Sequence, residues 1–188
     1  MLEKDVSEIL VSGAEIDEMV ERIAADIDRD YETSVKDGKK LLLLGILKGS
    51  IVFMGDLMKK ITLPVEIDFM KVSSYGTDAV SSGRVNILLD IRRPDISECD
   101  VLIVEDIIDS GRTLAYLCEY LKLNGAHSVK TCTLLDKPSR REVNFCPDYC
   151  GRQIPDEFVV GYGLDYAERY RTLPFVGILR REIYECGS

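Results

Sequence analysis

The stretch VLIVEDIIDSGRTL, residues 101–114, combines an apolar strand with the start of a helix. It opens with four aliphatic residues, passes through three carboxylates and ends in a short turn that contains Ser110 and Gly111. A continuous apolar run that is closed by a polar turn is typical of a strand buried on both faces of a parallel sheet. The stretch therefore predicts an α/β unit, in which ligands bind at the carboxyl end of the strand.

The same alternation of strand and helix recurs on both sides of this stretch. Helices are expected from Ser50 to about residue 58 and from residue 114 to a C-cap at Asn124 and Gly125. Further apolar strands are expected at residues 41–47, 65–72, 85–89, 129–135, 158–160 and 175–179. This order predicts an α/β fold with a Rossmann-like, mainly parallel sheet that is flanked by helices.

Two segments fit the alternation poorly. The first is the opening helix that the capping box of Ser12 and Glu15 predicts, and the second is the segment at residues 146–157. We therefore expect a single domain over residues 1–188 with a small hood lobe. The hood lobe is expected to form from the N-terminal segment, including the opening helix, and from roughly residues 140–188.

Composition and charge restrict the classes of function. The chain has 188 residues, of which 46% are apolar and 30% are charged, as in soluble globular proteins. Its net charge of −9 disfavours nucleic acid and anionic membrane surfaces as partners. Because the apolar run at residues 41–47 is far shorter than the roughly 20 residues of a membrane span, and residues 1–10 are too acidic for a signal peptide, we expect a cytoplasmic location.

Six cysteines are scattered along the chain without the paired spacing of a disulfide scaffold, which favours free thiols in a reducing compartment. Cys146 and Cys150 have a spacing found in some metal sites. No second pair of cysteine or histidine follows them, and His127 is the one histidine of the chain. A structural zinc site is therefore disfavoured.

The turn SGRT at residues 110–113 has the composition of an anion cradle, because it offers two hydroxyls, a glycine and the free amides of a helix start. The anion that this turn is expected to bind is phosphate. Asp109 would repel that phosphate, so its carboxylate is expected to act on another part of the ligand as a base or an acceptor. The alternative is an ordinary strand followed by a capped helix. Neither a P-loop nor a dinucleotide fingerprint is present.

Residues 105–113 resemble the phosphoribosyl pyrophosphate (PRPP) motif of type I phosphoribosyltransferases. The segments that resemble bacterial-type hypoxanthine phosphoribosyltransferases are LKGS at 47–50, SSYG at 73–76, DKPSRR at 136–141 and IPDEFVVGYGLDY at 154–166. The resemblance implies the type I phosphoribosyltransferase fold. It also implies a purine salvage enzyme that transfers the 5-phosphoribosyl group of PRPP to hypoxanthine, and to guanine, giving IMP or GMP and pyrophosphate.

The resemblance further implies a role for each matched residue on the PRPP side. Asp109 would be the general base, and Mg²⁺ would be the cofactor, held by Glu105, Asp106 and Asp165. The residues that would bind PRPP and its phosphates are Glu105, Asp106, Ser110, Gly111, Arg112, Thr113, Lys48, Gly49 and Arg171. Arg112 occupies a position taken to be variable, so no role is expected of its side chain.

On the purine side, the resemblance implies that Lys137 donates to the 6-oxo group of the base. Phe158 would stack on the base, and the backbone of Val159 would contact the edge of the base. Asp165 would also belong to the purine-binding residues. Ser74 and Tyr75 would belong to a lid that closes during turnover.

Two alternatives to this function remain at this point. One is a phosphoribosyltransferase that prefers xanthine. The other is a non-catalytic PRPP-sensing regulator, which would need a basic surface or a DNA-binding segment that the acidic chain does not show. The expected partners are PRPP and a 6-oxopurine base, with no nucleic acid and no membrane, and the resemblance implies a homodimer or homotetramer.

Overall fold

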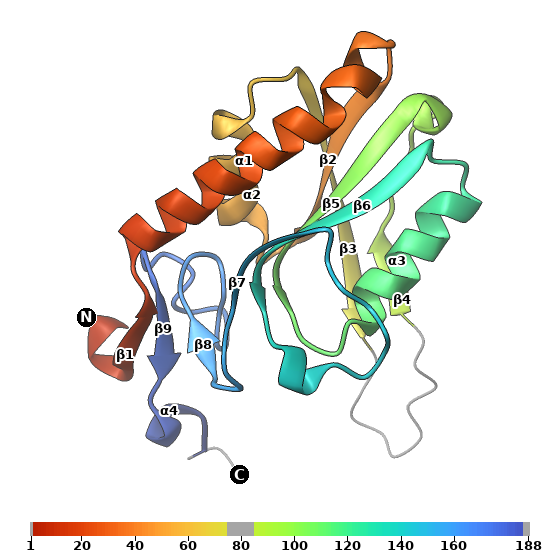
Figure 1. Ribbon diagram of the computed structural model, residues 1–188. Helices are drawn as coiled ribbons and strands as arrows, with labels where there is room; N and C mark the ends of the chain where they lie inside the picture. The colour runs from red at the N-terminus through yellow and green to blue at the C-terminus, as the bar shows by residue number, and fades with distance from the viewer. Residues whose placement is uncertain (1, 75–84, 186–188) are drawn as a thin grey trace.

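The structure is a computed structural model that describes residues 2–74 and 85–185. The chain builds a main sheet and a smaller hood sheet (Figure 1). The main sheet has the spatial order β4 (Val85–Leu89), β3 (Val65–Ser74), β2 (Lys40–Leu47), β5 (Cys99–Ile108), β6 (Ser128–Asp136) and β7 (Tyr149–Gln153). The hood sheet has the order β1 (Val6–Val11), β9 (Val176–Leu179) and β8 (Val159–Val160).

Five neighbouring strands of the main sheet are parallel, and only the edge strand β4 is antiparallel. The helices are α1 (Gly13–Lys36), α2 (Ile51–Lys60), α3 (Arg112–Leu123) and the short α4 (Arg181–Glu185), with 3-10 turns η1 (Leu2–Asp5), η2 (Ile96–Glu98) and η3 (Pro138–Arg140). Helices α1 and α2 cover one face of the main sheet and α3 covers the other (Figure 1). The predicted parallel sheet with flanking helices is confirmed.

The leucines of β2 explain why this strand is apolar throughout. Leu41 and Leu43 pack into the core beneath α1 and α2, whereas Leu42 and Leu44 pack into the core beneath α3. A strand that alternates between two covered faces needs apolar residues at every position. No helix in the described part of the chain has the length and apolar character that a membrane crossing requires.

The structure corrects two placements in the hood lobe. Helix α1 is predicted there, but its apolar stripe, including Ile16 and Ile27, packs against the main sheet beside Leu41. Residues 149–153 of the second segment form β7, which pairs in parallel with β6 at the edge of the main sheet. Local patterns could not reveal these positions, because each depends on partners that are distant in sequence.

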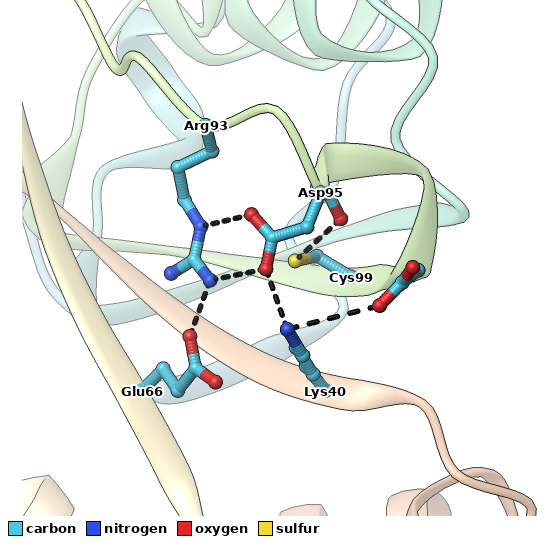
Figure 2. A network of polar contacts seen from close by, with 6 residues as sticks. Lys40, Glu66, Arg93, Asp95 and Cys99 are labelled. Atoms are coloured by element: carbon cyan, nitrogen blue, oxygen red, sulfur yellow. Dashed lines mark hydrogen bonds and ion pairs between the residues drawn. The ribbon is translucent and has the colours of Figure 1, made fainter.

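A network of charged side chains joins the amino ends of the neighbouring strands β2, β3 and β5 (Figure 2). Arg93 Nε lies 3.2 Å from Asp95 Oδ1, and Lys40 Nζ lies 2.6 Å from Asp95 Oδ2. Arg93 also pairs with Glu66 of β3, and the Cys99 thiol donates to the carbonyl of Asp95. The hydrogen bond from Arg93 and, to a smaller extent, the one from Lys40 hold the pKa of Asp95 well below its usual value.

We expect Asp95→Asn to lower the midpoint of chemical denaturation at neutral pH. A carboxyl group whose pKa is lower in the folded state stabilises the fold at pH values above its unfolded pKa, and this contribution is lost as the pH falls through the folded pKa. The deficit of the variant should therefore shrink towards strongly acidic pH. The control is Asp17→Asn on the exposed surface of α1, which should change the midpoint little; equal midpoints for all three proteins at pH 7 would contradict the assignment.

Candidate active site

The carboxyl ends of β2, β5 and β6 lie next to one another, because these three strands are parallel neighbours. A cavity of about 320 Å³ opens at the ends of β2 and β5. Its polar wall includes Glu105, Asp109, Ser110, Gly111 and Thr113. The structure thus gathers the central motif around one cavity, where an open α/β sheet binds its ligands.

The predicted anion cradle forms the turn between β5 and α3. Gly111 occupies the N-cap of α3 with φ of 80°, a left-handed conformation that suits glycine. A Cβ atom at this position would also lie 2.9 Å from Arg141 Cδ. The first amides of α3 have no partner within the helix, and the Arg112 amide donates to the Ser110 hydroxyl at 3.4 Å. A helix start of this kind is suited to binding an anion. The Arg112 side chain instead pairs with Glu142, with Nε 2.5 Å from Oε2.

Glu105, which is half-buried, and Asp106, which is buried, lie next to each other near the end of β5. Glu105 Oε2 is buried and has no hydrogen-bond partner among the described residues. Burial, together with the neighbouring Asp106, raises the pKa of Glu105 well above its usual value. Burial also raises the pKa of Asp106 to about 6, although the Ile107 amide, which donates to Oδ1 at 2.8 Å, opposes this change. The pair is electrostatically unsatisfied.

This unsatisfied pair suits a magnesium ion whose remaining ligands are water and the phosphates of a substrate. Mg²⁺ is usually held by one or two carboxylates, by water and by substrate phosphates. Asp165, the third predicted metal ligand, already pairs with Arg171, with Oδ1 2.8 Å from Nη2. Within residues 2–74 and 85–185, no group of three or more histidine, cysteine or acidic side chains is arranged to hold a metal ion alone.

We expect Glu105→Gln to stabilise the protein in the absence of divalent cations and substrates, because glutamine lacks the charge that burial and the neighbouring Asp106 disfavour. Because the pKa of Glu105 is raised on folding, wild-type stability falls as the pH rises above the unfolded pKa of about 4.3. The advantage of the variant should therefore appear near neutral pH and vanish below about pH 4. Urea denaturation at both pH values measures it.

The matched control for this experiment is Glu119→Gln, which changes an exposed residue of α3. It should leave the free energy of unfolding nearly unchanged at both pH values. A Glu105→Gln variant that is less stable than wild type at neutral pH would show that Glu105 has a stabilising partner.

Lys48 and Arg171 lie close to one carboxylate that sequence reasoning missed. Glu168 Oε1 is 3.0 Å from Lys48 Nζ, and Glu168 Oε2 is 3.4 Å from Arg171 Nη2. The hydrogen bond from Lys48, followed by that from Arg171, lowers the pKa of Glu168. The available signal was an acidic residue between the matched Asp165 and Arg171. The peptide bond that joins Leu47 to Lys48 is cis.

Gly49 lies at a close contact between the main sheet and the hood lobe. A Cβ atom on Gly49 would lie 1.7 Å from Asp106 Oδ2. From the hood side, a Cβ atom on Gly163 would lie 2.1 Å from the Gly49 carbonyl oxygen. The next residue, Ser50, stands at the N-cap of α2 as predicted, but its hydroxyl donates to the Ile46 carbonyl at 2.6 Å and does not cap the helix.

Lys137 follows β6 directly opposite Asp109, which follows β5. The Lys137 amide donates to the Ile108 carbonyl at 2.9 Å, and Lys137 Nζ lies 3.8 Å from Asp109 Oδ1. The Lys137 side chain is only 8% exposed, whereas that of Asp109 is 48% exposed. The structure therefore places a buried cation beside an accessible carboxylate at the mouth of the site.

Phe158 stands immediately before β8 and is partly exposed, while Val159 is buried within the hood sheet. Tyr184 of α4 stacks on the Phe158 ring with 4.8 Å between ring centroids, and Tyr166 meets that ring edge-on at 5.6 Å. Sequence reasoning missed Tyr184, because no local pattern links α4 to Phe158.

The predicted lid falls largely outside the described part of the chain. Ser74 is the last residue of β3. Tyr75 lies outside the described residues.

Comparison with known proteins places these observations in a family context. The sequence model of one protein family, the phosphoribosyl transferase domain, matches residues 7–167 of this chain. The hypoxanthine-guanine phosphoribosyltransferase of Bacillus subtilis (strain 168) is 46% identical over 185 residues, which cover 98% of this chain and 99% of the relative. The bifunctional protein TilS/HprT of Listeria monocytogenes serotype 4b is 49% identical over 97% of this chain, but the chain spans only 27% of that relative's length.

Among solved structures, a hypoxanthine phosphoribosyltransferase from Staphylococcus aureus matches with a TM-score of 0.90. It is 44% identical in sequence, and the match covers 97% of this chain and 96% of that chain. The likeness therefore extends over both the main sheet and the hood lobe.

Proposed function

The chain belongs to the phosphoribosyl transferase family, and on that premise we propose that it is a purine salvage enzyme that transfers the 5-phosphoribosyl group of PRPP to hypoxanthine and guanine. The products are the nucleoside monophosphate and pyrophosphate. The observation that carries the proposal is the meeting of Asp109, Lys137 and the phosphate-binding turn at adjoining ends of β5 and β6.

The turn after β5 holds the 5-phosphate of PRPP. The hydroxyls of Ser110 and Thr113 and the free amides at the start of α3 donate hydrogen bonds to it, and Gly111 lets the backbone approach closely. No cationic side chain is needed at this position, because the helix start already favours an anion. This agrees with the Arg112 side chain being engaged by Glu142.

Lys137 selects the base by donating to its 6-oxo group. Hypoxanthine and guanine both carry an acceptor there, whereas adenine carries an amino group, which is a donor and cannot accept a hydrogen bond from the Lys137 ammonium. Asp109 lies beside Lys137 and removes the proton from the imidazole nitrogen of the purine. Phe158 stacks on the base, and the backbone of Val159 meets its edge.

Pyrophosphate leaves with high negative charge, which several groups of the site neutralise. Lys48, the Gly49 amide and Arg171 contact the pyrophosphate of PRPP. Mg²⁺, when it is held by Glu105, Asp106 and Asp165, supplies further charge neutralisation to the leaving group. Glu105 and Asp106 also accept hydrogen bonds from the ribose hydroxyls.

Two further features belong to the same proposal. The protein acts in the cytoplasm, as the resemblance and the free thiols indicate. It assembles as a homodimer or homotetramer.

The test is to incubate the protein with PRPP and Mg²⁺ and one base at a time, offering hypoxanthine, guanine, xanthine or adenine, and to measure pyrophosphate release. Turnover with hypoxanthine and guanine and none with adenine is expected. Faster turnover with xanthine would favour the xanthine-preferring alternative. No turnover with any 6-oxopurine would overturn the enzyme assignment and favour a non-catalytic PRPP-binding protein.

A further inference from the structure

Residues 141–145, which we call the strap, cross the backbone of the turn that follows β5. The Glu142 amide donates to the Ser110 carbonyl at 3.0 Å. Gly111 fits beneath the strap only because it lacks a side chain, since a Cβ atom there would lie 2.9 Å from Arg141 Cδ and 3.2 Å from Val143 Cγ2. The strap therefore braces the turn through contacts at Ser110 and Gly111.

Arg141 makes the central contacts of the strap. Its Nη1 donates to the carbonyl oxygen of Asp109, its Nη2 donates to Asp136 Oδ1, and its Nε donates to the Phe145 carbonyl at 2.9 Å. The Arg141 side chain is only 15% exposed, and that of Asp136 is 7% exposed. A planar guanidinium group donates in fixed directions, so it sets the relative positions of its three acceptors.

These acceptors belong to the two strand ends that carry the proposed chemistry. Asp136 is the last residue of β6 and directly precedes Lys137. Ile108, the last residue of β5, pairs with Asp136 in register and directly precedes Asp109. The last backbone hydrogen bond between the two strand ends runs from the Lys137 amide to the Ile108 carbonyl, at 2.9 Å. Beyond it, Arg141 is the side chain that joins the backbone of Asp109 to the end of β6.

We propose that Arg141 is a positioning residue for the transfer reaction. It fixes the turn that carries the Asp109 carboxylate relative to Lys137, so that the base is held by Lys137 and deprotonated by Asp109 in one geometry. Arg141 acts through Asp109 and Asp136 and does not itself take part in the chemistry. This inference rests on the proposed function of the same site.

A purely structural role for Arg141 makes a different prediction. The buried pair with Asp136 would then matter only for folding, and any folded variant that keeps a positive charge at this position would turn over normally. Lysine distinguishes the two roles. Its single ammonium group can pair with Asp136, but it cannot at the same time donate to the Asp109 carbonyl in the fixed geometry of the two guanidinium nitrogens of Arg141.

The experiment compares Arg141→Lys with Arg140→Lys in the full chain, by steady-state kinetics with PRPP and hypoxanthine and by thermal unfolding. Arg140 is the matched control, because it is the adjacent arginine but is 53% exposed and pairs with Asp156 on the surface. We expect Arg141→Lys to lower kcat by roughly 10- to 100-fold, the scale of a small misplacement of reacting groups, with KM for PRPP changed less than about threefold. Arg140→Lys should keep kcat within about twofold of wild type.

A second variant guards against a loss of folding. Arg141→Ala removes the fork, and added guanidinium ion at millimolar concentration should restore part of its kcat, whereas methylammonium ion should not. If Arg141→Ala does not fold, the double variant Asp136→Asn/Arg141→Met removes the buried charge as well and should still show the kcat defect.

Wild-type kcat in Arg141→Lys, with or without a lower melting temperature, would overturn the positioning role. A defect confined to KM for PRPP would also overturn it, because that result would place Arg141 in substrate binding. Failure of the proposed function would look different, since wild-type protein and the Arg140→Lys control would then show no turnover.

Discussion

Replacing Asp109 with asparagine is expected to lower kcat by roughly 100- to 10,000-fold, the usual contribution of a positioned general base. Asparagine has nearly the same size as aspartate but cannot accept a proton at neutral pH. The change should not disturb the proposed 5-phosphate site, because Asp109 faces the cavity next to Lys137, whereas the phosphate is proposed to bind at the turn that follows. Affinity for PRPP should therefore remain within about threefold of wild type.

Initial rates of nucleotide formation give kcat for this variant, and calorimetric titration of PRPP in the presence of Mg²⁺ gives the affinity. Asp156→Asn is the control, because Asp156 is an exposed carboxylate that pairs with Arg140 on the surface. Its kcat should equal that of wild type. Parallel losses of turnover and PRPP affinity in Asp109→Asn would refute the role of Asp109 as base.

Replacing Gly49 with alanine is expected to reduce kcat/KM for PRPP by roughly 100-fold or more, because displacements of about 1 Å in an active site have effects of this size. The added methyl group would overlap the Asp106 carboxylate, at 1.7 Å from Oδ2. The Gly49 backbone cannot retreat easily, because Gly163 of the hood lobe lies against its carbonyl. Either the Asp106 carboxylate, which we propose to hold the metal, or the loop at Lys48 and Gly49, which we propose to bind pyrophosphate, must move.

Gly55→Ala is the matched control for this variant. Gly55 lies within α2, and a Cβ atom there would meet no atom within 4 Å. Alanine should stabilise the helix by up to about 1 kcal/mol and leave kcat/KM unchanged. Circular dichroism checks that Gly49→Ala is folded. A folded Gly49→Ala variant with wild-type kcat/KM would show that the close approach to Asp106 is not needed.

The parts of the fold that sequence predicted correctly are those with strong local signals. The apolar runs of β2 and β5 and the capping box of α1 were each visible within a dozen residues. The capping box is present in the structure, where the Ser12 hydroxyl accepts from the Glu15 amide and the Glu15 carboxylate accepts from the Ser12 amide. Parallel order then brought the strand ends together as expected.

The missed features depend on contacts between distant segments. The strap owes its position to Gly111 and to Asp136, and nothing in residues 141–145 signals a brace. Glu168 lies next to Lys48 only because the hood folds back over the loop after β2. The residue types were visible in the sequence, but their partners are determined by tertiary packing, which local periodicity does not encode.

The pairing of β1 with β9 has a consequence for the order in which the protein folds. Val11 lies opposite Val176, and Val6 lies opposite Leu179, so the hood sheet joins strands from opposite ends of the described chain. During synthesis every strand of the main sheet leaves the ribosome before β9 does, so β1 has no partner until nearly the whole domain has emerged. Contacts of such long sequence separation form slowly. The part of the proposed site that the hood supplies is therefore assembled last.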